Sequence, residues 1–383
     1  MVGIWQDVFL QKIPNVYISD TYVKPKVESD ELEVGEGVAQ AKLYGTKLQL
    51  GTAYSTNGKE IYEICLQTGN ERLVDEFPTP DKLPLIPYHR ESRRVNGLVR
   101  FDVKHIAKPF ESSIPLYRTG IAVGDYPIDH HHKKNIKAPQ HLDFYPVPSF
   151  NIPLGSLIPQ HVSGLIIAEK SISVSNVVNG TTRLQAIALL IGQAAGTLAA
   201  LSVQQNLDAQ EVPVRKVQLG LLNSNAYIMP YYDVSLSHNH FVAAQKIGAT
   251  GILKGEGVPF SWANRTLFHP DSLVNRLALI KDLADFYMLP STNKTHLTLL
   301  EAIDIIIEIA KKNNLQQKQS TWNFNNKKML SDQIQNAWKQ WKFGSFKTDM
   351  ALTRIQFAQL FDATINPFEL QQIDHNGNIK SIY

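Results

Sequence analysis

The sequence predicts a protein of mixed helix and strand, of the α+β or α/β class, and three observations lead to this prediction. Short runs of β-forming residues broken by glycine turns occupy the first 150 residues. An apolar run, a polar loop and a long uncharged helix follow one another between residues 163 and 203. Past residue 212 the pattern changes to helices joined by short loops. The 383 residues are enough for two or three domains with this succession of elements.

The first region contains a hairpin signal and lacks a nucleotide-binding one. Asn57-Gly58 lies between two β-like runs, which is typical of a tight hairpin turn. The glycine-rich turn that grips the pyrophosphate of a dinucleotide, with the pattern G-x-G-x-x-G after a strand, does not occur there. The single cysteine, Cys65, excludes an intramolecular disulfide and a cysteine-based metal site.

The stretch from Ser163 to Val203 carries most of the information on function. The apolar run Leu165–Ala168 predicts a strand buried on both faces. A polar loop follows, and its last residues, Asn179 to Arg183, offer helix caps, a glycine and a cation. Because the start of a helix presents unpaired N–H groups, we expect this point to hold an anion or a polarised ring.

The helix that follows, Leu184 to Val203, contains no charged residue. Its length would span a bilayer, but it is rich in alanine, includes glutamine and hydroxyl side chains, and has no flanking cluster of cations. We therefore predict a helix inside the protein and no membrane span. Gly192 and Gly196 give it a face of little bulk, which allows close approach of a sheet or a ligand; a simple core helix is the alternative.

Two further groups of residues suggest chemistry. Arg93 and Arg94 could clamp an anionic group or form a surface ion-pair cluster with Glu91. Asp129 and His131 would point the same way from a strand and could move a proton to or from a substrate. A metal site or a purely structural role are the alternatives for the histidines, and no further ligand at an informative spacing supports metal.

Several of these strings resemble the bacterial FAD-dependent oxidoreductase family, in order and over roughly residues 88 to 201. The matching strings are Arg90-Glu91-Ser92-Arg93-Arg94, Tyr126-Pro127-Ile128-Asp129 with His131, Asn151 to Pro159, Gly180 with Arg183, and Gly192-Gln193-Ala194-Ala195-Gly196. Glu169-Lys170 departs from the Gly-Arg that this family usually has, and Asn176 stands where it often has histidine.

The resemblance implies flavin redox chemistry with FAD as cofactor, a small-molecule or carbohydrate-type substrate, proton transfer by Asp129 and His131, and no metal. The residues implied in cofactor binding are Arg93, Arg94, Ala168, Glu169, Gly180, Thr181, Thr182, Arg183, Gly192, Gln193 and Gly196. Since the glycine-rich turn is missing, we expect weak FAD affinity for this chain alone. Its partner would be an N-terminal FAD-domain segment or a second copy.

The region after residue 212 resembles S-layer homology repeats. Thr298 with Glu301 and Thr353 with Gln356 form capping boxes that predict helix starts. The aromatic residues from Trp322 to Phe346 predict helix packing rather than a ligand platform. The tail Asp374 to Asn378 has the wrong spacing for a calcium loop and predicts a frayed end.

The resemblances divide the chain into three parts: a β-rich substrate or cap region (1–150), the C-terminal strand-helix part of an FAD-binding domain (151–211), and an all-α S-layer-homology-like domain (212–383). The net charge of +3 without a basic patch argues against nucleic acid. No signal peptide is visible, although members of the family are often exported. The alternative function is a non-catalytic cell-wall or protein-binding module that retains a degenerate flavin-domain scaffold.

Overall fold

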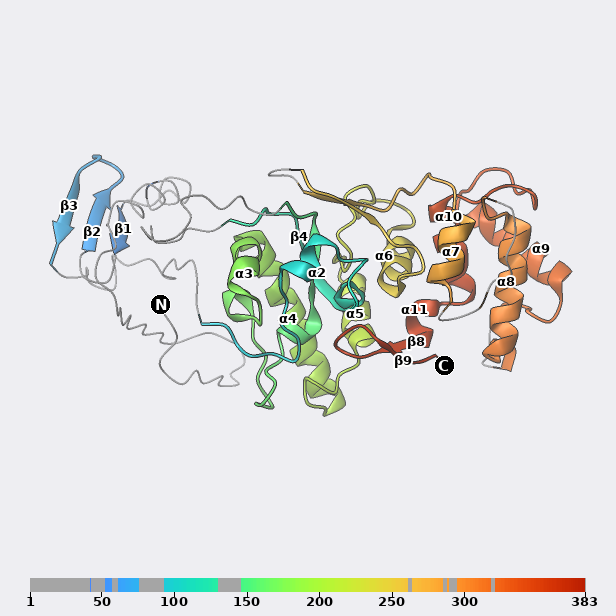
Figure 1. Cartoon of the computed structure of the whole chain (residues 1–383), viewed down its shortest axis with the longest axis horizontal. Coiled ribbons are helices and arrows are strands. Elements are labelled where there is room, and N and C mark those ends of the chain that lie inside the picture. Colours follow the sequence, from blue (N-terminus) through green and yellow to red (C-terminus); the bar gives the residue numbers. More distant parts are fainter. Residues whose placement is uncertain are drawn as a thin grey trace. The chain divides into compact units, whose positions relative to one another are not determined.

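The computed structural model describes residues 42, 52–56, 61–75, 93–129, 146–260, 264–284, 288, 295–317 and 321–382 (Figure 1). The chain forms two compact units, residues 1–93 with 131–141 and residues 94–130 with 142–383. The predicted boundaries at residues 150 and 211 are not tested by this division and stay predictions. The mixture of helices and small sheets agrees with the broad α+β class.

The smaller unit contains a three-stranded antiparallel sheet. Strand β1 (Thr52–Thr56) pairs with β2 (Ile61–Cys65), which pairs with β3 (Glu71–Val74). Thr56 lies opposite Ile61, so the predicted hairpin is confirmed; its turn lies outside the described residues. Ile64 is buried and Cys65 is partly exposed.

The larger unit begins with a second small sheet. Helix α2 (Val103–Ala107) and the 3-10 turn η2 (Leu116–Thr119) lead into β4 (Gly120–Gly124), which pairs antiparallel with β5 (Phe150–Pro153) before η3 (Leu154–Ser156). The buried amide of Asn151 donates to the carbonyl oxygens of Tyr117 at 2.8 Å and Ile228 at 2.9 Å. These bonds tie the sheet to both flanking segments.

The predicted buried strand Leu165–Ala168 is wrong. Residues 165–168 have no regular secondary structure, and Leu165 is 43 % exposed. The N–H of Ile167 donates to the carbonyl of Leu157 at 2.8 Å. A strand needs a repeated ladder of backbone hydrogen bonds, and a strand buried on both faces also needs cover for Leu165; among the described residues the run has neither.

The predicted loop before the long helix is also wrong in part. After η4 (Glu169–Ser171) the chain forms helix α3 (Asn176–Thr182), capped by Ser175, whose hydroxyl accepts from the N–H of Val178 at 3.2 Å. The long helix α4 (Gln185–Gln205) starts after a two-residue break. Asn179, Gly180, Thr181 and Thr182 therefore belong to a helix, because the serine upstream caps it earlier than the predicted caps would.

Helix α4 packs against β4 and against α5 (Val214–Asn223) (Figure 1). Its buried residues are Ile187, Ile191, Ala194 and Leu198. By length and composition it could cross a membrane, and 22 % of its apolar window is buried inside the protein. The assignment of α4 to the protein interior stays a prediction.

The C-terminal region is mainly helical, but the expectation of an all-α domain is wrong because two hairpins interrupt it. One joins β6 (Glu256–Val258) to β7 (Arg265–Leu267), and the other joins β8 (Gln371–Ile373) to β9 (Ile379–Ile382). The helices are α6 (Phe241–Thr250), α7 (Arg276–Asp282), α8 (Leu299–Lys312), α9 (Lys327–Gln340), α10 (Arg354–Thr364) and α11 (Pro367–Leu370), with η5 (Leu315–Gln317) between α8 and α9.

Both predicted capping boxes are confirmed at the starts of α8 and α10. The predicted frayed end is wrong: Asp374 to Asn378 form the turn of the last hairpin. The carboxylate of Asp374 accepts from the N–H groups of Asn376 and Asn378, each at 2.9 Å, and Gly377 has a φ of +83°. An aspartate that accepts from the following amides and a glycine in the left-handed region are what a tight turn needs.

Candidate functional site

The segment Asp125–Asp129 leaves the end of β4 where α4 crosses that strand. Gly124 makes the crossing possible: a side chain there would place its Cβ 2.6 Å from Cδ1 of Ile187 on α4 and 2.8 Å from Cζ of Phe150. The amide of Asn264 donates to the carbonyl of Asp125 at 3.1 Å and fixes the start of the segment. The strand and the helix together therefore determine where residues 126 to 129 lie.

The end of α3 holds the other end of this segment. The hydroxyl of Thr181 donates to the carbonyl of Tyr126. Nη2 of Arg183 donates to the carbonyl of Asp129 at 2.9 Å and lies 4.0 Å from the carboxylate oxygen Oδ2 of that residue. Arg183 is 9 % exposed. This buried cation positions Asp129 through its backbone and its charge.

The carboxylate of Asp129 is oriented and reaches solvent. The hydroxyl of Tyr126 donates to its Oδ2 at 3.3 Å, and the side chain is 26 % exposed. Sequence reasoning missed this role of Tyr126, although its position three residues before Asp129 was the available signal. His131, the predicted partner of Asp129, lies outside the described residues, so the predicted pair stays a prediction.

Helix α3 contributes a buried amide with no partner. Asn179 is fully buried, and neither its Oδ1 nor its Nδ2 has a hydrogen bond. Sequence reasoning took Asn179 for a helix cap, so it missed this feature. Leaving a buried amide unpaired costs about 1–3 kcal/mol, so the side chain is a candidate for hydrogen bonding to a bound group.

The predicted close-approach face of α4 is exposed. Gly192, Gln193 and Gly196 lie on the surface, and a Cβ added at either glycine would meet no atom within 4 Å. Leu189 is 75 % exposed and Val203 is 81 % exposed. The described residues thus leave room for a ligand or another surface along this uncharged face.

Ala168 and Glu169 lie at the turn into η4. Ala168 is the residue before that turn, and Glu169 has a φ of +63°, in the left-handed region that favours glycine. The carboxylate of Glu169 pairs with Lys170. Glycine adopts this backbone conformation readily, which explains why the family usually has glycine at this position.

The boundary between the two compact units falls between the two predicted clamp arginines, which are neighbours in the chain. Arg93 is exposed and ends its part of the smaller unit, whereas Arg94 opens the larger one. Next to Arg94, the N–H of Val95 donates to the carbonyl of Ser171 at 2.9 Å, which brings this backbone beside η4. The rest of the arginine string lies outside the described residues, and the predicted clamp is not tested.

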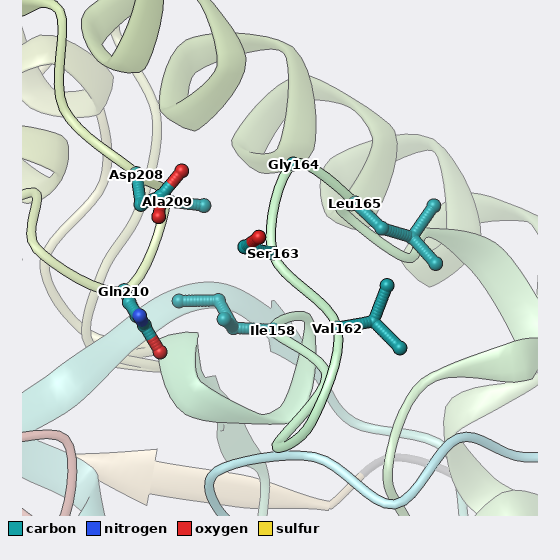
Figure 2. Close-up of a pocket in the computed structure, with 8 residues that line it drawn as sticks. All are labelled: Ile158, Val162, Ser163, Gly164, Leu165, Asp208, Ala209 and Gln210. Carbon is teal, nitrogen blue, oxygen red and sulfur yellow. The ribbon is translucent and has the colours of Figure 1, made fainter.

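The described residues fit a flavin nucleotide on one side. The glycine-bearing face of α4 gives it room, and the N-cap of α4, Leu184, offers no side-chain acceptor to the first N–H groups of the helix. A separate hollow between residues 158–165 and 208–210 has a volume of about 10 Å³, room for one water and not for a ring (Figure 2). Among the described residues, no group of His, Cys, Asp and Glu could hold a metal ion.

Comparison with known proteins assigns a family to this chain. Residues 22–221 match the FAD dependent oxidoreductase family. The match covers more than half of the sequence, and the chain belongs to this family. No curated protein matches it.

One solved structure has a similar segment. It is a fragment of a protein described as an HsdR subunit of a type I restriction enzyme from Vibrio vulnificus YJ016, 54 % identical over 14 % of this chain and 10 % of that chain, with a TM-score of 0.13. The match spans about a tenth of that protein, and a score this low says nothing about the fold.

Proposed function

We propose that this chain supplies the flavin-facing helix and an oriented carboxylate to an FAD-dependent oxidoreductase that acts on a small molecule. The observation that supports this most directly is the exposed face of α4, which carries no charge, holds Gly192 and Gly196, and has open space above both. FAD would lie along this face. The cofactor accepts or donates the electrons when bound, and the protein positions it and the substrate.

The roles of the residues follow from their contacts. Gly192 and Gly196 let a planar ring approach the helix backbone, and the exposed amide of Gln193 can hydrogen-bond to it. Arg183 is a positioning residue, because its guanidinium donates to the backbone of Asp129. Asp129 takes up or returns a substrate proton, with Tyr126 holding its carboxylate in place. The proposed second proton carrier is His131.

The second side of the cofactor site is proposed to come from another surface. FAD binding in dinucleotide folds depends on a glycine-rich turn, and the sequence has no such turn after a strand. Exposed apolar side chains such as Leu189 and Val203 on α4 also indicate a surface that is covered in the working protein. An FAD-domain segment outside this sequence, or a second copy of the chain, would cover it.

Titration with FAD tests the proposal. We expect added FAD to raise the melting temperature of the chain and to change the flavin absorbance spectrum, with weak affinity. Gly192→Leu and Gly196→Leu should fold, since nothing lies within 4 Å, and should lose at least tenfold in FAD affinity. Gln335→Leu, exposed on α9 and away from α4, is the control and should bind as the wild type does. A colourless protein that FAD does not stabilise would contradict the proposal for this chain.

A second candidate function is a protein-binding scaffold that has lost the cofactor. It is favoured by the burial of Gly180, Thr181 and Thr182 inside a helix, where they serve the fold. In that case the leucine substitutions on α4 would weaken association with a protein partner, or of two copies, and FAD would have no effect on melting.

A further inference from the structure

An arginine between two exposed aromatic rings lies on the β6–β7 hairpin. The guanidinium carbon of Arg265 lies over the ring of Tyr232, 4.5 Å from its centroid, and 5.4 Å from the centroid of Phe260. Tyr232 is 66 % exposed and Phe260 is 60 % exposed. The group therefore presents two open ring surfaces beside one guanidinium, which is a combination that can stack on an apolar face and pair with an anion.

The backbone around this group is firmly held. The N–H of Tyr232 donates to the carbonyl of Thr266 at 2.9 Å, and the buried hydroxyl of Thr266 donates to the carbonyl of Ser149 at 2.7 Å. Because residues alternate along a strand, the anchored Thr266 directs Arg265 to the opposite face. The N–H of Phe260 donates to the side chain of Asn264 at 2.9 Å, and Asn264 is 4 % exposed. The three side chains thus stand on a rigid support.

The charge of Arg265 is not compensated within the described chain. Its Nε is shielded from solvent and has no hydrogen bond, and its guanidinium forms no ion pair with a described residue. The neighbouring acids have other partners: Glu256 lies 2.7 Å from His269, and Asp233 accepts from the N–H groups of Phe268 and His269, each at 2.7 Å. A planar fork of donors without a carboxylate is suited to take one from a ligand.

We propose that Tyr232, Arg265 and Phe260 form a binding platform for an acidic sugar, that is, a saccharide unit that carries a carboxylate. The guanidinium would hold the carboxylate in a bidentate pair, while an exposed ring would stack against the apolar face of the sugar. A nucleic acid fits less well, because its binding needs several cations along a phosphate chain, and the described platform offers one guanidinium. The platform is independent of the flavin proposal, since no side chain proposed to contact a ligand is common to the two; Asn264 only supports the backbone of both.

Affinity measurement with defined polymers tests this platform. The full chain is titrated by calorimetry with polygalacturonate, with neutral dextran and with a single-stranded oligonucleotide. We expect binding to polygalacturonate alone. Arg265→Gln should lower that affinity at least tenfold, Tyr232→Ala should lower it several-fold, and Arg265→Lys should retain part of it because charge remains without the fork.

The control removes an arginine charge elsewhere. Arg72 is exposed and pairs with Glu63 at 2.9 Å in the smaller unit, so Arg72→Gln should leave polygalacturonate binding unchanged. Should Arg265→Gln fail to fold, Tyr232→Ala decides the question, since its ring is mostly exposed. The proposal is overturned if polygalacturonate does not bind, if it binds equally to the platform variants, or if the oligonucleotide binds as tightly.

Discussion

Two long apolar helices of the larger unit, α4 and α8, are built in opposite ways. In α8, eight of the fourteen residues are buried, and its charged residues Glu301, Asp304, Glu308, Lys311 and Lys312 lie elsewhere on the helix. Its start is closed by the capping box of Thr298 and Glu301. In α4, four of twenty-one residues are buried, no residue is charged, and the N-cap has no side-chain bond.

The two helices differ in how well their outer surfaces suit contact with water. The charged residues on the outer side of α8 suit permanent contact with water, so this helix needs no further surface to cover it. The outer side of α4 offers only glycine, alanine, glutamine and a few large apolar side chains to solvent. Exposing such an apolar surface to water costs free energy, and the cost grows with its area. Covering the surface with a ligand or another protein surface therefore stabilises it. This contrast is the physical basis for placing FAD on α4.

Removing large side chains from the two helices should give the largest difference. Ile306 on α8 is fully buried, so Ile306→Ala should lower the free energy of unfolding by about 3 kcal/mol. Leu189 on α4 is 75 % exposed, so Leu189→Ala should change it by less than about 0.5 kcal/mol. Urea unfolding measures both. Equal losses of unfolding free energy in the two variants would show that Leu189 is already buried and that α4 and α8 do not differ.

The helix α4 has no ionisable group, so the dependence of stability on pH should come from other helices, here α10 and α6. Asp362 on α10 is buried 3.6 Å from Lys246 of α6, and burial raises the pKa of its carboxyl to about 6, from an ordinary value of 3.8; the lysine opposes this rise. The folded protein therefore binds the proton more tightly than the unfolded chain. Its stability should fall as pH rises from about 4 to 6, by about 2 kcal/mol.

Asp362→Asn tests this assignment. The variant should lose the fall in stability between pH 4 and 7 and should exceed the wild type in stability at pH 7. Asp304→Asn is the control, because that carboxylate is half exposed and pairs with Lys327 on the surface. A slope that persists in Asp362→Asn would assign the pH dependence to another group.

Local signals in the sequence predicted those elements that local contacts determine. The capping boxes at Thr298 and Thr353 involve residues three apart, and both were found as predicted. The hairpin around Asn57-Gly58 depends in the same way on its own turn and the two strands beside it. Gly192 and Gly196 were correctly placed on one face of α4, because the period of a helix fixes that geometry.

Other features depend on residues far apart in the sequence, and pattern alone could not give them. The pattern of Leu165–Ala168 predicts a buried strand, but whether a strand forms depends on which segments pair with it. Nothing in the spacing shows that Arg183 donates to the carbonyl of Asp129, fifty-four residues earlier. Likewise, only the packing around α3 shows that the amide of Asn179 is buried without a partner.

The smallest effect concerns the glycines themselves. Glycine costs about 1 kcal/mol relative to alanine inside a helix, so Gly192→Ala should raise the free energy of unfolding by about that amount, as should Gly196→Ala, because open space receives the new methyl group. Gly248→Ala on α6 should instead lower it, since a Cβ there would lie 2.6 Å from Cε2 of Tyr231. Urea unfolding compares the three variants.

A higher free energy of unfolding in Gly192→Ala and Gly196→Ala would mean that the chain keeps two glycines that its own fold does not require. That outcome would strengthen the view that the space above them is reserved for a bound group. A loss of stability at both positions would show that this face of α4 is packed against the protein, and the distinction between α4 and α8 would then disappear.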